Sequence, residues 1–259
     1  MKTMTWATMA ALLIGAGACN QASIAKGGEA AAVTFEARPD LAEGAEALPR
    51  LIGDGEAIAA INADLDRRDA AAGADCYGGG EGGIERGVSQ PMTGPGFISF
   101  SIAEGQLCEG ASSPETEHTA ITYDLATGQP VDWVAAAPGL QLTRGDTTDR
   151  PADYVPGLSS TALSEWYRAE ALTSPEREHA EQCAEIWTHQ HLGVSGFQVW
   201  LDAREGGLSI KPRFSQMAMG CANTVTLNPE EMRRFGVSPA IVDAVVAGHA
   251  AGSWEPKED

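Results

Sequence analysis

The cysteines limit the possible folds more than any other residue type. The chain has five of them, Cys19 near the start and then Cys76, Cys108, Cys183 and Cys221. If Cys19 does not take part in a disulfide, the other four cysteines can form two disulfides, and three pairings are possible. The sequential pairing, Cys76–Cys108 and Cys183–Cys221, places one crosslink in each half of the chain. Each bond would close a loop of roughly thirty to forty residues and stabilise the fold by roughly 3–4 kcal/mol through chain entropy.

The first residues have the pattern of an export signal. Lys2 is the only charge before an apolar run from Met9 to Ala18, and this run ends in small residues. Such an arrangement predicts a signal peptide over 1–18. The run is shorter than the ~20 apolar residues that cross a bilayer, which disfavours a permanent anchor helix. We therefore expect export to an oxidising compartment, where disulfides form and persist.

The end of this run, "AGAC" over 16–19, resembles a bacterial lipobox, in which the cysteine is diacylated and becomes the new N-terminus. The alternative is ordinary signal-peptidase cleavage just before Cys19 or after Ala22. Because Cys19 is the odd cysteine, lipidation is favoured, and two acyl chains give a stable membrane anchor. Residues 19–31 then form a flexible tether. Asn20 after the lipidated cysteine favours the outer membrane in a cell that has two.

Composition restricts the partners. The net charge is −19, which argues against binding to nucleic acid and against electrostatic docking on anionic lipid. It permits a basic partner, although an acidic surface more often serves only for solvation. The apolar content of 43% is that of a globular chain. A mature length of about 240 residues suits one large domain or two closely packed small ones.

Hydrophobic patterning predicts an α+β fold with antiparallel sheets and peripheral helices, in two closely packed halves over 32–150 and 151–250 followed by a tail over 251–259. Strands are expected at 32–38, 96–104, 118–125, 197–203 and 208–214, with extended chain over 216–227. Helices are expected at 53–73, 133–137, 159–172 and 174–192, and after Asn228 and Ser238. In the helix over 53–73, Asp54 is the expected cap, Ile58, Ile61 and Leu65 share the buried face, and the charges lie mostly outside.

Two sequences that imitate catalytic or nucleotide-binding motifs lack the required context. Gly78, Gly80 and Gly83 satisfy G-x-G-x-x-G, but no buried strand precedes them, so a flexible loop is expected. Ser195 in "GVSGF" lacks the second glycine of a nucleophile elbow, because Phe197 takes its place. Ser195 is expected in the turn before a strand. We expect no catalytic residue.

The best candidates for a metal site are His179, Cys183, His189 and His191. The first two are four residues apart on a helix, the last two alternate on an extended segment, and imidazole with thiolate suits zinc or copper. However, Cys183 is needed as the partner of Cys221, and no Cys-x-x-Cys pair provides a usual zinc spacing. We expect surface histidines, no metal and no cofactor.

Four aromatic residues could line a sugar-binding surface. They lie at helix and strand spacing, which is more typical of core positions. The four are Trp166, Tyr167, Trp187 and Trp200.

In the segment 108–133, "CEGASSPETEHTAITYDLATGQPVDW", a Gly-Ala pair leads into a strand, a D-x-x-T-G turn over 124–128 and a helix. The segment 197–235 has a hairpin, an irregular strand and a helix. Both resemble an exported bacterial family that includes the ectodomain of RsiV-type lysozyme-sensing anti-sigma factors and an accessory domain of some peptidoglycan deacetylases. The resemblance extends in element order over most of 32–247.

This resemblance implies a domain of unknown function that binds outside the cytoplasm, in some members to lysozyme or cell-wall material. Relatives commonly carry a histidine just after the Gly-Ala pair, whereas here Ser112 stands there and His118 follows further on. No catalytic residue is therefore transferred to this chain.

We expect a membrane-tethered extracytoplasmic binding lipoprotein of the bacterial cell envelope, without catalytic activity. The candidate ligands are peptidoglycan and a basic envelope protein such as lysozyme. The positive charge of such a protein would speed its encounter with an acidic chain. A cell-wall-acting enzyme and a purely structural envelope lipoprotein are the alternatives.

Overall fold

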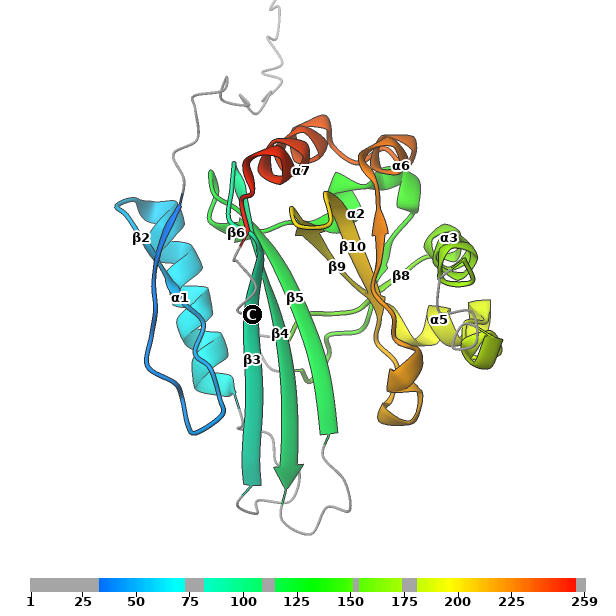
Figure 1. Ribbon diagram of the computed structural model, residues 1–259, viewed down its shortest axis with the longest axis horizontal. Coiled ribbons are helices and arrows are strands. Elements are labelled where there is room, and N and C mark those ends of the chain that lie inside the picture. The colour runs from blue at the N-terminus through cyan, green and yellow to red at the C-terminus, as the bar shows by residue number, and fades with distance from the viewer. Residues whose placement is uncertain (1–32, 73–81, 109–114, 151–153, 174–180, 255–259) are drawn as a thin grey trace, which may run out of the picture.

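The computed structural model describes residues 33–72, 82–108, 115–150, 154–173 and 181–254 (Figure 1). Its strands are β1 (Thr34–Glu36), β2 (Arg50–Ile52), β3 (Gly82–Met92), β4 (Phe97–Cys108), β5 (Glu115–Asp124), β6 (Gln129–Pro130), β7 (Thr143–Arg144), β8 (Leu158–Ser159), β9 (Phe197–Asp202), β10 (Gly207–Pro212) and β11 (Val225–Leu227). Its helices are α1 (Glu56–Ala71), α2 (Trp133–Ala136), α3 (Thr161–Ala171), α5 (His189–Ser195), α6 (Pro229–Arg234) and α7 (Pro239–Ala251), with 3₁₀ helices η1 (Pro138–Leu140) and η2 (Gln216–Cys221).

The strands form three antiparallel sheets, in the orders β1-β2, β3-β4-β5-β6 and β11-β10-β9-β8-β7. Helices lie around the two larger sheets, so the expected α+β class with antiparallel sheets and peripheral helices is confirmed (Figure 1).

Helix α1 and the β1–β2 pair cover one face of the β3–β6 sheet (Figure 1). Apolar residues recur at helical spacing in α1, so that Ile61 and Leu65 are fully buried in the same core as Phe100 and Tyr123 of the sheet. Ile58 packs against the edge of this core. The predicted buried face of the helix is therefore confirmed.

The charged residues of α1 do not lie mostly outside, as the sequence led us to expect. Asp64 and Arg68 are buried, and the Asp69 side chain is only 9% exposed. Asp66 and Arg67 match the expectation, with side chains open to solvent, and so does Glu56 at the start of the helix. Burying a charge is tolerated when it is paired, and each buried member of this group has a partner.

The partners come from strands that are distant in the sequence. Arg50 of β2 and Arg86 of β3 each donate to Asp69 across 2.7 Å, and the Tyr123 hydroxyl of β5 donates to Asp64. Burial alone would raise the pKa of Asp64, but the hydrogen bond from Tyr123 and the neighbouring arginines outweigh it and lower that pKa. The ionic cluster thus fixes α1 on the sheet.

The second half builds its own core on the β7–β11 sheet. Strands β9 and β10 form the expected hairpin, and Phe197, Val199 and Leu201 point into the core. Trp166, Tyr167, Trp187 and Trp200 are all buried. The core interpretation of these four aromatic residues is confirmed.

Side-chain caps begin three of the expected helices. Asp132 accepts a backbone N–H of α2, Ser160 accepts one of α3, and Asn228 forms a reciprocal capping box with Glu231 in α6. Helix α7 begins after Ser238 with a proline in its first turn.

Four local expectations are wrong. Helix α1 is preceded by Gly55 rather than Asp54, because the chain turns there with a φ of 125° that favours glycine. Residues 188–191 are not extended, since the Thr188 hydroxyl caps the first turn of α5. Residues 216–221 form η2 rather than extended chain. Gly83, expected in a loop, lies in β3.

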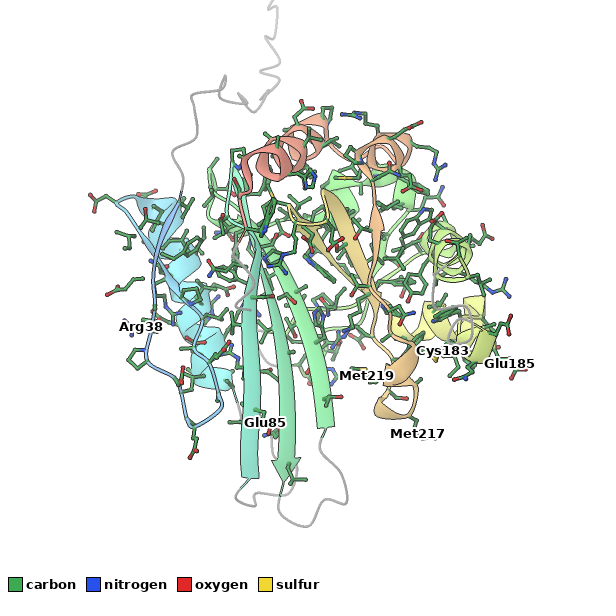
Figure 2. All side chains as sticks on the ribbon, in the orientation of Figure 1. Arg38, Glu85, Cys183, Glu185, Met217 and Met219 are labelled. Carbon is green, nitrogen blue, oxygen red and sulfur yellow. A yellow bond between two sulfur atoms is a disulfide. The ribbon has the colours of Figure 1, made fainter. Side chains whose placement is uncertain are left out.

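The Cys183–Cys221 disulfide is formed, with the two Cα atoms 5.5 Å apart, and this pairing is confirmed (Figure 2). Cys76 lies outside the described residues, so its bond to Cys108 stays a prediction. The signal peptide, Cys19, the tether and the helix start at 174–180 also lie outside them. None of the helices in the described part of the chain has the length and apolarity needed to cross a bilayer.

The two larger sheets meet where β9 approaches β5. The Leu201 amide donates to Thr122 Oγ1 across 3.1 Å, and the Ala203 amide donates to the Pro91 carbonyl across 2.9 Å. The second core also takes in buried side chains from 133–142, so the two halves interlock. Each of the two larger sheets therefore has one face on its own apolar core, and the other faces of these two sheets meet each other.

Candidate functional site

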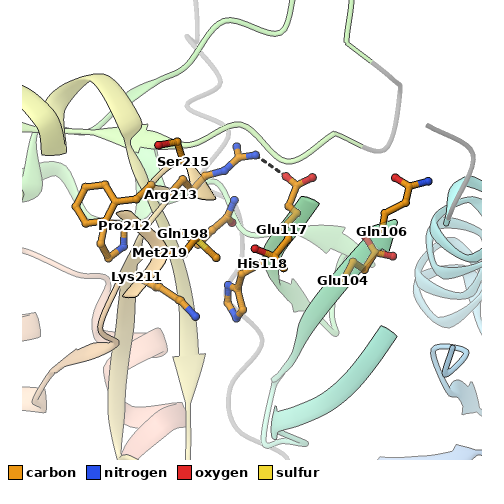
Figure 3. Close-up of a pocket in the computed structure, with 12 residues that line it drawn as sticks. Glu104, Gln106, Glu117, His118, Gln198, Lys211, Pro212, Arg213, Ser215 and Met219 are labelled. Atoms are coloured by element: carbon orange, nitrogen blue, oxygen red, sulfur yellow. Dashed lines mark hydrogen bonds and ion pairs between the residues drawn. The ribbon is translucent and has the colours of Figure 1, made fainter. Parts of the chain in front are cut away.

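A cavity of about 310 Å³ lies between β5 of the first half and β9–β10 of the second (Figure 3). Strand ends and the start of η2 surround it, where Met219 points inward and Met217, on the same helix, is fully exposed (Figure 2). The residues that line it are Glu104, Gln106, Thr116, Glu117, His118, Gln198, Lys211, Pro212, Arg213, Phe214, Ser215 and Met219.

The register of the β9–β10 hairpin brings the central polar residues together. Gln198 and Lys211 are direct partners across the two strands, so their side chains lie on the same face of the sheet. That face is turned toward β5, because the Gln198 side-chain carbonyl accepts from the Ala120 amide at 3.5 Å. Figure 3 shows Lys211 reaching from β10 toward His118 on β5.

His118 joins the two sheets. Its Nε2 atom lies 2.8 Å from Ser101 Oγ on β4, and its ring packs against Trp200 of β9 with centroids 5.3 Å apart. Burial, and to a smaller extent the positive charge of Lys211, lowers the pKa of His118 to about 4. The imidazole is therefore neutral at pH 7 and contributes hydrogen-bonding atoms rather than charge.

Three of the four charged side chains that line the cavity have ion-pair partners. Glu117 pairs with Arg213 across 2.6 Å, and Glu104 pairs with the buried Arg86 across 2.9 Å. Lys211 has no hydrogen-bond or ion-pair partner within the described part of the chain, and burial lowers its pKa. Arg86 is shared with Asp69, and the four charged residues of the lining sum to zero, so the distinctive feature of the pocket is one cation that lacks a direct partner.

Three further polar atoms at the junction between the sheets are buried without a hydrogen-bond partner among the described residues. They are His118 Nδ1, Gln198 Nε2 and Trp200 Nε1. Gln198 and Trp200 are only 2% and 4% exposed, so these groups have been taken out of water without compensation. Leaving a buried donor unpaired costs about 1–3 kcal/mol, which marks this junction as more than a packing surface.

Ser101 and His118 form the only contact here that resembles catalytic machinery. A serine nucleophile needs a basic histidine, and that histidine is usually oriented by a third group. The pKa of about 4 makes His118 a weak base at neutral pH, and its Nδ1 has no orienting partner among the described residues. Ser101 also does not line the cavity. The arrangement suits binding better than nucleophilic catalysis.

Only two of the four residues considered as metal ligands have described side chains, because the side chain of His189 lies outside the described part of the structure. Cys183 is bonded to Cys221 and cannot act as a thiolate, and His191 is exposed on α5. His179 lies outside the described residues, as do Gly78 and Gly80. Among the residues that are described, no three histidine, cysteine or carboxylate side chains gather in a way that could hold a metal ion.

Sequence reasoning named His118 only in passing and missed Gln198, Lys211 and Arg213. One signal was available. Of the four lysines in the chain, the other three lie near its ends, so Lys211 is a lone lysine within the fold. It also alternates with Ser209 and Arg213 on the polar face of a predicted strand. This polar face lies opposite β5 only because the two halves pack together, and no local sequence pattern reveals that packing.

Comparisons with known proteins give limited information. No protein-family model matches the chain, and no curated protein matches its sequence. Among solved structures, a DUF3298 family protein from Pseudomonas aeruginosa PAO1 aligns with a TM-score of 0.37 and 11% identity, over 63% of this chain and 66% of that one. A member of the same family from Bacteroides fragilis NCTC 9343 aligns with a TM-score of 0.35 and 15% identity, over 71% and 69%. Both TM-scores are below 0.5, so these structures do not indicate a function for this chain.

Proposed function

We propose that this chain is an extracytoplasmic binding lipoprotein of the bacterial cell envelope, anchored to the membrane through Cys19 and without catalytic activity. Its ligand is cell-wall material, bound in the cavity between β5 and β9–β10. The observation that carries the proposal is the set of unpaired polar groups at this junction, centred on Lys211 and Gln198. A cavity with a few convergent polar groups is the usual form of a ligand site.

The disulfide supports the location. Disulfides form and persist in oxidising compartments and are rare in the cytosol, and the Cys183–Cys221 bond ties η2, which borders the cavity, to the second core. The sequence pattern that ends at Cys19 supports the anchor independently.

Lysozyme is the second candidate ligand, because the net charge of −19 favours encounter with a basic protein. The resemblance of 108–133 and 197–235 to an exported binding family points the same way. A cell-wall-acting enzyme is disfavoured by the weak basicity of His118, and a purely structural lipoprotein would have no use for an unpaired cation at the junction.

Binding of the full chain, purified in detergent, to isolated peptidoglycan and to lysozyme tests the proposal. We expect retention on peptidoglycan at both low and high salt, because a shaped pocket is less salt-sensitive than surface charge. Binding to lysozyme alone would transfer the function to the second candidate, and turnover of peptidoglycan would overturn the non-enzymatic assignment. The intact mass of the membrane-extracted chain should include a diacylglyceryl group, and a mass without lipid would contradict the anchor.

A further inference from the structure

The geometry points to a carboxylate as the group that the cavity between β5 and β9–β10 recognises, held by Lys211 and Gln198 with His118 beside them. This inference rests on the proposed function and names the chemical class of its ligand. It is carried by the ion pairs of the cavity, by the donors that are left unpaired, and by the size and lining of the cavity.

The ion pairs of the lining leave one cation, Lys211, available to bind a singly charged anion. The two carboxylates of the lining already have arginine partners, Glu117 with Arg213 and Glu104 with Arg86. Arg213 is held further by the Tyr154 hydroxyl and the Val155 carbonyl, which leaves little capacity for a ligand. Lys211 is the remaining cation, and one anionic group would neutralise it.

A doubly charged anion such as a phosphate monoester fits less well. One of its charges would stay uncompensated beside Glu104 and Glu117, and repulsion between like charges grows in a partly buried site. A cation is excluded by Lys211 itself. A carboxylate carries a single negative charge, which the ammonium of Lys211 can pair.

The unpaired donors match the two oxygens of a carboxylate. Gln198 Nε2 can donate two hydrogen bonds and the Lys211 ammonium three, and their positions opposite each other on β9 and β10 let both reach one group. His118 Nδ1 becomes a third donor when Nε2 accepts from the Ser101 hydroxyl. A bound carboxylate would favour this tautomer of His118.

The size of the cavity and its apolar lining indicate which part of the ligand lies next to the carboxylate. A cavity of about 310 Å³ is at the lower end of the range for ligand sites, so it holds the end of a chain rather than an extended polymer. Pro212, Phe214 and Met219 provide an apolar wall, which suits a small apolar side chain or the carbon frame of a sugar. The C-terminus of a short peptide and an acidic sugar are therefore the two sources of the carboxylate.

Titration calorimetry with four small probes tests the inference on the full chain in detergent. The probes are the dipeptide Ala-Ala, its C-terminal amide, glucuronate and glucose. We expect at least one acid to bind at least tenfold more tightly than its neutral counterpart, because hydrogen bonds to charged groups are the strong ones. Preference for Ala-Ala identifies a peptide C-terminus and preference for glucuronate an acidic sugar. If each acid binds no more tightly than its own neutral counterpart, the inference is overturned.

Variants locate the effect. Lys211→Met keeps most of the length of the side chain and removes its charge, and it should weaken binding of the preferred acid at least tenfold. Gln198→Glu places a fixed carboxylate beside Lys211 and should abolish binding. Arg233→Gln, on the exposed side of α6, changes the net charge as much as Lys211→Met does and should leave binding unchanged. Equal loss in Arg233→Gln would assign the effect to overall charge and refute the pocket.

Two outcomes separate this inference from the proposed function. If peptidoglycan retains the unmodified chain and Lys211→Met equally, the binding function stands and the carboxylate site is refuted. If the acids bind in the pocket but peptidoglycan is not retained, the carboxylate site stands and the assignment to cell-wall material fails. Circular dichroism and thermal unfolding of each variant show whether a loss of binding comes from misfolding.

Discussion

Replacing His118 with asparagine should reduce the loss of stability of this protein in mild acid. Burial lowers the pKa of His118 from 6.5 to about 4 in the folded chain. Below pH 6.5 the unfolded chain therefore takes up a proton at this position that the folded chain does not accept until about pH 4. The stability that His118 contributes is fully present above its unfolded pKa and is lost as the pH falls toward 4.

The magnitude follows from the two pKa values. Each tenfold change in proton affinity is worth ~1.4 kcal/mol, so the full effect is about 3 kcal/mol of unfolding free energy. Most of it, about 2–3 kcal/mol, should be visible between pH 7.5 and 4.5. Many carboxylates titrate over the same range, so the measured quantity is the difference between the wild-type chain and His118→Asn.

Chemical denaturation at several pH values and constant ionic strength provides the measurement. Ser101→Ala is the matched control, because it removes the partner of Nε2 but leaves the ring buried, and its stability should fall with acid as steeply as that of the wild type. If wild type and His118→Asn lose stability in parallel, His118 is not held neutral by burial. The description of His118 as a buried residue of the junction would then be wrong.

Two further predictions concern the interior. Asp69→Asn removes the buried carboxylate that Arg50 and Arg86 share and leaves them with only the more exposed Asp66 and Glu104, so it should reduce the unfolding free energy by about 3 kcal/mol. Asp66→Asn, at an exposed position of α1, should cost about 1 kcal/mol or less. Urea denaturation of both variants measures the difference, and equal costs would contradict a buried ionic cluster. The double variant Cys183→Ser/Cys221→Ser opens a loop with a sequence separation of 38 and should lose about 4 kcal/mol. Calorimetric unfolding checks this value, and an unchanged midpoint would show that the crosslink does not constrain the unfolded chain.

The parts of the fold that could be predicted are those that short-range physics determines. The β9–β10 hairpin, the caps at Ser160 and Asn228 and the D-x-x-T-G turn each depend on residues a few positions apart. In that turn Gly128 has a φ of 70° and lies against the backbone of Ala57, where a Cβ atom would clash. The sequence pattern identified the turn, but its contact with α1 came only from the structure.

The parts that could not be predicted depend on contacts between distant segments. The buried charges of α1 resemble a solvated face until Arg50, Arg86 and Tyr123 are brought beside them by the sheet. The candidate site has the same origin, because Lys211 meets His118 only when β10 packs opposite β5 (Figure 3). Periodicity reports which face of an element is polar, but it does not report which other polar face lies opposite.

The polarity of the junction between the sheets is the strongest reason to assign it a function. Each sheet already has an apolar core on its other face, so the junction adds stability only if its own groups are satisfied. Burying unpaired donors and half-burying an ammonium without a partner there reduce stability, and an apolar residue of similar size at position 211 would avoid part of that cost. Natural sequences keep such local defects mainly where a site needs them. Because the defects are donors and a positive charge, the missing component is an acceptor with a negative charge, and a carboxylate supplies both.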